Sequence, residues 1–181
     1  MRCYARDGLL RVGIEDIRRE AGASPSSVYH QFANADAIVL ALLVRIFTSL
    51  FEHLATRVGR TRTAEGAVRA LVDGHIEWIA DHPDDGRFMY QAMTLEAGGL
   101  DAVSRDALIA EKRVLLGPVV NHLGGFIARG ELPDLPAELL DVVLLGPAHE
   151  ALRRHLAGGT EFDPARLRKL LPALAWKSVA R

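Results

Sequence analysis

Cysteine is nearly absent from this sequence of 181 residues, which contains only Cys3. A single cysteine cannot form an intramolecular disulfide, and this composition indicates a reducing, cytoplasmic setting. The N-terminal segment MRCYARDG carries charges and lacks an apolar core, so no signal peptide is predicted. An excess of one charge is absent too. Because the net charge is −1, any nucleic-acid-binding surface would be local.

The motifs of enzymes and metal sites are also missing. The sequence has no G-x-S-x-G, P-loop or G-x-G-x-x-G motif, and Cys3 has no neighbouring base, which argues against an enzyme. Seven histidines raise the question of a metal, but His75, Glu77 and His82 lack the i, i+4 spacing of ligands on one helix face. We interpret them as structural or surface residues and expect neither a metal nor a cofactor.

Strand patterns are lacking, whereas helical periods run through the whole chain. No stretch alternates apolar and polar residues with β-branched enrichment, so the predicted fold class is all-α. Apolar residues make up 49% of the sequence, which is enough for a core. Glycine and proline boundaries divide the chain into about nine helices, with predicted ranges Arg2–Asp7, Ile14–Ala21, Pro25–Phe32, Ala35–Val58, Ala64–Ala80, Asp84–Ala97, Leu100–Arg129, Ala137–Ala157 and Pro164–Ala180.

The most apolar stretch, Ala37–Leu54, is long enough to raise the question of a membrane span. Arg45 interrupts its middle, and Thr48 and Ser49 follow. We therefore interpret it as a buried central helix and expect no membrane partner.

The segment Ile14–Phe32, IEDIRREAGASPSSVYHQF, has the pattern of a helix-turn-helix. In its first helix, Ile14, Ile17 and Ala21 stand at helical spacing and can pack inward. The turn Gly22-Ala23-Ser24 has the short length that sets two helices at a steep angle. The pattern thus predicts a helix, a tight turn and a second helix.

The second helix begins favourably, because Ser24 is a good N-cap and Pro25 stands at the first helical position. Val28 and Phe32 are spaced i, i+4 and would anchor the helix on its packed side. Taken piecemeal, these residues also fit an ordinary short helix. The remaining positions are small or hydrogen-bonding groups free to face a DNA groove: Pro25, Ser26, Ser27, Tyr29, His30 and Gln31.

Here the chain resembles the tetracycline-repressor (TetR) family. Members carry the pattern A-G-[VA]-S-x-x-[ST]-[LV]-Y-x-[HY]-F, and Ala21–Phe32 (AGASPSSVYHQF) fits it at nearly every position. Ala33–Leu40 stands at the usual start of the family's fourth helix. Ala128–Leu135 (ARGELPDL) and Leu144–Pro147 (LLGP) resemble segments of its ligand domains. The resemblance spans most of the chain and is diffuse between Arg60 and Asn121.

The resemblance implies a helix-turn-helix DNA-binding domain in residues 1–34 and a helical ligand-binding and dimerisation domain in residues 35–181. It implies a transcriptional regulator that works as a homodimer. The regulator would be a repressor that binds a palindromic operator in double-stranded DNA and is released by a largely apolar small-molecule effector. The alternative is a small-molecule-binding helical dimer with lost or impaired DNA binding. A DNA-binding assay on a palindromic duplex separates the two.

The resemblance also assigns roles to residues. Ser24 and Ser27 would bond phosphates or cap the second helix, and Tyr29 and His30 would contact the DNA backbone. Base edges would be approached by Pro25, Ser26 and Gln31.

Two further sets of residues are implied in the second domain. The first set lies on the predicted helices Ala64–Ala80, Asp84–Ala97 and Leu100–Arg129. In a generic bundle these residues would be core, whereas the family places an effector pocket between these helices: Trp78, Phe88, Met89, Tyr90, Met93 and Phe126. The second set makes the last two helices apolar on more than one face and predicts an intersubunit four-helix bundle: Leu139, Leu140, Val143, Leu144, Leu152, Leu167, Leu170, Leu171 and Leu174.

Three features depart from the family's pattern. Only seven residues precede Gly8, where members have a first helix of several turns, and we interpret the first helix as truncated. Glu15 stands where a basic or neutral residue often faces phosphates, so its charge would oppose DNA. Ala35 stands where a lysine commonly pairs with a phosphate, so that contact would be lost.

Overall fold

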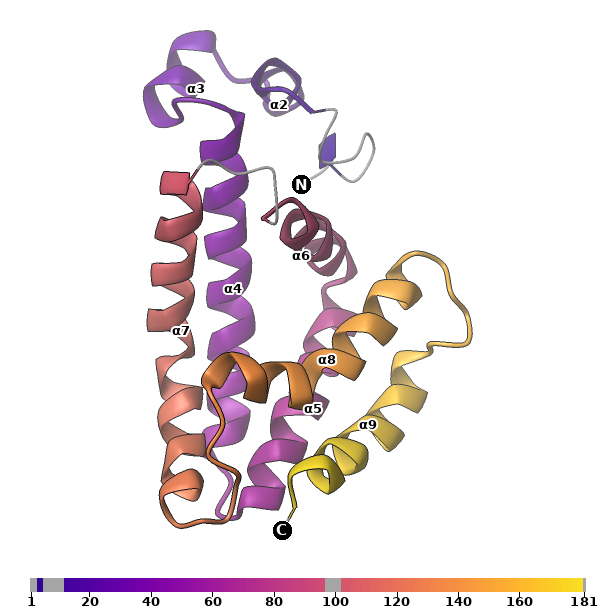
Figure 1. Ribbon diagram of the computed structural model, residues 1–181. Helices are drawn as coiled ribbons and strands as arrows, with labels where there is room; N and C mark the ends of the chain where they lie inside the picture. Colours follow the sequence, from indigo (N-terminus) through magenta and orange to yellow (C-terminus); the bar gives the residue numbers. More distant parts are fainter. Residues whose placement is uncertain (1–2, 5–11, 97–101, 181) are drawn as a thin grey trace. The chain divides into compact units, whose positions relative to one another are not determined.

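The computed structural model describes residues 3–4, 12–96 and 102–180. These residues contain helices and no strand, which confirms the all-α prediction (Figure 1). The first predicted helix, Arg2–Asp7, lies largely outside the described residues. The other eight predicted helices are present within two residues at each end: α2 Ile14–Ala21, α3 Pro25–Gln31, α4 Ala35–Gly59, α5 Ala64–Asp81, α6 Pro83–Glu96, α7 Ala102–Ala128, α8 Ala137–Leu156 and α9 Pro164–Val179.

Several helices begin at residues whose side chains satisfy an N–H group of the first turn. Such caps are strongly preferred because the first N–H groups of a helix have no partner within it. At α3, α4, α5 and α9 the accepting oxygens lie 3.2, 2.8, 3.1 and 3.1 Å from the backbone nitrogen, and they belong to Ser24, Asn34, Thr63 and Asp163. Local sequence thus fixes where these helices start.

The chain divides into two compact units, residues 1–47 with 84–112 and residues 48–83 with 113–181. The first unit contains α2, α3, α6 and the first parts of α4 and α7, and buries Leu43, Ile46, Phe88, Met89 and Leu108. In the second unit α5 packs on both α8 and α9, which also pack on each other. Its buried residues include Leu54, Val58, Ile76, Leu144 and Leu152. The domain boundary expected near Asn34 stays a prediction.

By length and composition alone, α4 qualifies as a candidate membrane span. The core helix of a soluble protein passes the same test. Of the α4 residues, Leu43 and Ile46 are buried in the first unit and Leu54 is buried in the second. Arg45 in its middle is exposed, and its Nη2 lies 2.9 Å from Asp85 Oδ1. These contacts support the interpretation of α4 as a core helix.

Candidate nucleic-acid interface

The turn of the helix-turn-helix depends on a glycine. Gly22 has φ +61°, a left-handed conformation that costs glycine little and other residues more. The N–H groups of Gly22 and Ala23 bond the carbonyls of Arg19 and Arg18 at 3.2 and 3.1 Å. α2 therefore stops at this point, and the chain enters α3 within three residues.

α3 presents one face to solvent. Val28 and Phe32 are half-buried, consistent with the anchoring role that their spacing predicts. In α2, Ile14 and Ile17 are half-buried as well, whereas Ala21 is exposed because the helix ends there. The residues expected to meet DNA are all exposed: Ser24, Pro25, Ser26, Ser27, Tyr29, His30 and Gln31.

Hydrogen bonds join the two helices across the turn. The Tyr29 hydroxyl donates to Glu15 Oε1 at 3.1 Å, and Arg18 Nε donates to Glu15 Oε2 at 2.8 Å. Arg18 Nη1 also donates to the Ala23 carbonyl at 3.2 Å. We call Glu15, Arg18 and Tyr29 the head link, because it connects α2, the turn and α3.

The head link also sets charge states. The hydrogen bond from Arg18 lowers the pKa of Glu15, and the hydrogen bond to Glu15 raises the pKa of Tyr29. At neutral pH the carboxylate is therefore ionised and the phenol keeps its single proton. Tyr29 cannot donate that proton to Glu15 and to a DNA phosphate at once. The sequence indicated the opposing charge of Glu15 but gave no signal of its contact with Tyr29.

The six residues expected at an effector pocket are divided between the two units. Trp78 and Phe126 belong to the second unit, where Trp78 is 2% exposed and its Nε1 donates to Ser49 Oγ at 3.2 Å. The first unit contains the other four, of which three are buried and one is half-buried: Phe88, Met89, Tyr90 and Met93. Burial suits both core and pocket residues, so the pocket stays a prediction.

A groove of about 230 Å³ lies in the first unit, and none of those six residues lines it. Its walls are mainly apolar and come from the N-terminal residues, α2 and α4: Cys3, Tyr4, Ile17, Glu20, Ala21, Ile38 and Leu42.

The residues expected at the dimer interface fall on two sides of α8 and α9. Four are buried within the chain: Leu140, Leu144, Leu152 and Leu167. Val143 and Leu171 are half-buried. The exposed members are Leu139, Leu170 and Leu174, and Val142, which was not in the predicted set, is exposed beside them in sequence. One chain therefore covers part of the predicted set itself.

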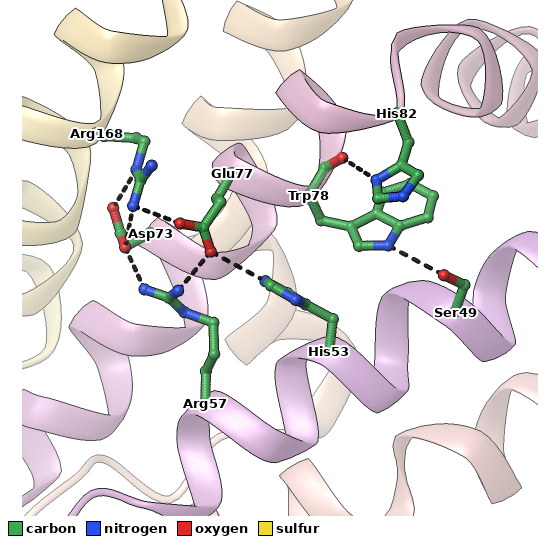
Figure 2. A network of polar contacts seen from close by, with 8 residues as sticks. All are labelled: Ser49, His53, Arg57, Asp73, Glu77, Trp78, His82 and Arg168. Carbon is green, nitrogen blue, oxygen red and sulfur yellow. Dashed lines mark hydrogen bonds and ion pairs between the residues drawn. The ribbon is translucent and has the colours of Figure 1, made fainter.

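A charge network in the second unit was not predicted (Figure 2). Asp73 and Glu77 of α5 pair with Arg57 of α4 and with Arg168 of α9. We call these four residues the charge network. The only signal in the sequence is a pair of acids four residues apart on a largely apolar helix, which does not reveal the distant arginines.

The two histidines considered for a metal site, His75 and His82, pack against different rings. His75 is buried, packs edge-on against His149 with ring centroids 4.6 Å apart, and has a pKa lowered well below its usual value by burial. His82 stacks on Trp78 at 4.5 Å. Within the described part of the chain, no group of three or more His, Cys, Asp or Glu residues is placed to hold a metal.

Comparison with known proteins bears directly on the segment that contains the helix-turn-helix, which we call the head. Residues 1–42 match the family model described as bacterial regulatory proteins, tetR family. The HTH-type transcriptional regulator BetI of Brucella anthropi is 31% identical over 72 residues, which are 40% of this chain and 37% of that protein. The match thus spans little more than a third of the relative's length.

Solved structures share the fold. A TetR family transcription regulator from Marinobacter aquaeolei VT8 aligns with a TM-score of 0.80 and 17% identity over 99% of this chain and 90% of that one. The ketosteroid transcriptional regulator KstR2 of Mycobacterium tuberculosis aligns with a TM-score of 0.68 and 21% identity over 99% and 90%. Residues 1–42 thus match the tetR family model in sequence, and the chain shares its fold with solved structures of TetR family regulators.

Proposed function

We propose that the protein is a DNA-binding transcriptional regulator, a homodimeric repressor that a small, largely apolar effector releases from a palindromic operator. The observation that carries the proposal is the exposed, hydrogen-bonding face of α3 on a capped helix-turn-helix. A short helix with such a face enters the major groove and reads base edges there.

The residues of α3 divide into readers and positioning groups. Ser24 accepts the N–H of Ser27 and so serves as the cap. Gln31 can make a bidentate contact with adenine, and Ser26 bonds bases without selectivity. Tyr29 and His30 contact phosphates and fix the register, which adds affinity without sequence information.

Exposed apolar residues on α8 and α9 support a homodimer. Leu139, Val142, Leu170 and Leu174 are 48–62% exposed in the single chain. A twofold contact between two copies removes this surface from water, and it places two heads on DNA. Two recognition helices about 34 Å apart fit successive major grooves, which explains a palindromic site.

An effector acts by favouring a dimer whose heads no longer match that spacing. Aromatic and methionine side chains like those of the predicted pocket set suit an apolar molecule, and the shared fold with a protein named as a ketosteroid regulator supports that class. An effector bound beside Trp78 should change the fluorescence of Trp78 and leave that of Trp176 nearly unchanged. If Trp78→Phe retains the full ligand-dependent signal in a broad screen, the pocket lies elsewhere.

One observation favours the alternative, a small-molecule-binding dimer with impaired DNA binding. The ionised Glu15 accepts the hydrogen bond of the Tyr29 hydroxyl, so this hydroxyl cannot donate to a phosphate at the same time. The charge of Glu15 weakens attraction to DNA on the face that must approach it.

Selection from random duplexes at moderate salt tests the proposal. The homodimer should enrich a sequence with two related half-sites about 10 base pairs apart. Binding without any sequence preference, or no binding, refutes the repressor and leaves the small-molecule-binding dimer.

A further inference from the structure

The acidic pair on α5 is unusual for its spacing. Asp73 and Glu77 stand four residues apart, so their carboxylates share one helix face and repel each other. Their side chains are only about a quarter exposed, at 22% and 23%, so water screens this repulsion less than at an open surface. The pair is stable in the fold only with positive charge between or beside the carboxylates.

Two arginines supply that charge, and each bonds both acids. Arg168 Nε lies 2.7 Å from Asp73 Oδ1, and its Nη2 lies 2.9 Å from Glu77 Oε1. Arg57 Nη2 lies 2.5 Å from Asp73 Oδ2, and its Nη1 bonds Glu77. Figure 2 shows the two guanidinium groups on either side of the carboxylates. The four charges of the network sum to zero, and removal of either arginine leaves a net charge of −1 on the three residues that remain.

The backbone leaves room for this arrangement at one position. Gly74 follows Asp73, and a Cβ there would lie 2.8 Å from Arg57 Cδ and 3.1 Å from Arg57 Nε. Such distances are shorter than side chains tolerate, so glycine lets Arg57 lie along α5. Arg57 is thus held in place by packing as well as by charge.

The two arginines come from helices with different tasks in the proposed function. Arg168 lies on α9, two residues before the exposed Leu170 and six before Leu174. Arg57 lies near the end of α4, which is one continuous helix from Ala35 to Gly59 and begins directly after the helix-turn-helix. The carboxylates of α5 therefore join the dimerisation helix to the helix that follows the head.

We propose that the charge network is the joint that holds α4 to α9, and that Arg168 is a positioning residue which fixes the two heads of the dimer for one half-site spacing. The inference rests on the proposed function, because it concerns how the same DNA site is reached. With the joint intact, the dimer contact sets the direction of α4. Without it, α4 adopts more directions, and the cost of aligning both heads on one operator rises.

The test compares Arg168→Gln with the wild-type homodimer on three kinds of duplex. These are the selected operator, the operator lengthened or shortened by one base pair between its half-sites, and a duplex with a single half-site. Arg69→Gln is the matched control, because it removes an exposed ion pair with Glu65 that lies within α5 alone. Sedimentation and circular dichroism establish that each variant is a folded dimer.

Arg168→Gln should weaken binding to the operator by about 2- to 30-fold, the range over which residues that couple two sites act. Its affinity for the single half-site should not change, and the penalty for altered spacing should shrink. Arg69→Gln should behave like wild type on every duplex. These readouts separate positioning from a general loss of stability, which lowers binding to all duplexes alike.

If Arg168→Gln does not fold, Arg168→Lys provides the test, since it keeps the charge but lacks the planar fork that bridges two carboxylates. It should show the same relaxed spacing to a smaller degree. A folded dimeric variant with the wild-type spacing preference overturns the inference, as does an equal loss on all three duplexes. A wild-type protein that prefers no duplex refutes the proposed function instead, and that outcome appears before any variant is compared.

Discussion

Replacing Gly74 by alanine should destabilise the protein, although the same change normally stabilises a helix. Alanine in a helix interior is favoured over glycine by about 1 kcal/mol. Here the added Cβ meets Arg57 Cδ at 2.8 Å and Leu54 Cδ2 at 3.3 Å. The contact atoms lie within the Arg57 chain rather than at its far end, so the whole guanidinium must move.

Two costs oppose the gain in helix propensity. Overpacking of a filled site costs about 1–3 kcal/mol. Displacement of Arg57 weakens its bonds to Asp73 and Glu77, which contribute about 1 kcal/mol after allowance for partial exposure. The expected net loss in the free energy of unfolding is therefore about 1–3 kcal/mol.

Urea unfolding at one fixed protein concentration measures this change, since dimerisation makes stability depend on concentration. Gly124→Ala in α7 is the control, because no atom lies within 4 Å of its added Cβ, and it should stabilise by up to about 1 kcal/mol. In a background with Arg57→Ala, the cost of Gly74→Ala should largely disappear. A midpoint that rises as much for Gly74→Ala as for Gly124→Ala refutes the reasoning.

Three further predictions concern the dimer surface, the head link and a buried histidine. Leu174→Asp should yield monomer in sedimentation without loss of helicity, because the side chain is exposed in the single chain and only the dimer would bury the charge. The control Val114→Asp on α7, at a site 72% exposed, should leave the dimer intact. Monomers from both variants would contradict this interface. Glu15→Ala should strengthen binding to all duplexes alike, because it removes both the acceptor of the Tyr29 hydrogen bond and a negative charge. Weaker binding would show that the head link helps DNA binding. Burial keeps His75 neutral in the native state, whereas in the unfolded state its pKa is near the ordinary value of 6.5, so the free energy of unfolding should fall as the pH drops below 6.5, by up to about 1.4 kcal/mol per pH unit. His75→Gln should flatten this pH dependence in urea unfolding. An unchanged slope would assign it to other groups.

Much of the fold could be predicted because helix limits depend on local chemistry. Ser24 as a cap, Pro25 at the first helical position and Gly22 at a left-handed position are each recognisable from their immediate neighbours. The exposed face of α3 followed from the spacing of Val28 and Phe32 in the same way. These signals act within one or two helical turns, which is the range over which a single sequence is informative.

The rest depends on residues far apart in the chain. Arg168 and Asp73 are separated by 95 positions, and no local pattern indicates that they meet. On α8, Leu139 and Leu140 look equivalent in sequence, yet Leu139 is exposed and Leu140 is buried. Helical periodicity identifies apolar faces without saying whether the same chain or a second copy covers them. For the same reason it cannot distinguish a core tryptophan from one in a pocket.

The central claim, that α3 reads DNA, is tested most directly by the base preference of Gln31→Ala. The measurement is the affinity of wild type, Gln31→Ala and Tyr29→Phe for the selected duplex and for duplexes changed at one position of each half-site. The account predicts that Gln31→Ala loses about 1–3 kcal/mol of discrimination at one position, while Tyr29→Phe keeps the wild-type preference. If Gln31→Ala retains full discrimination at every position, this face of α3 does not read the bases and the account is wrong.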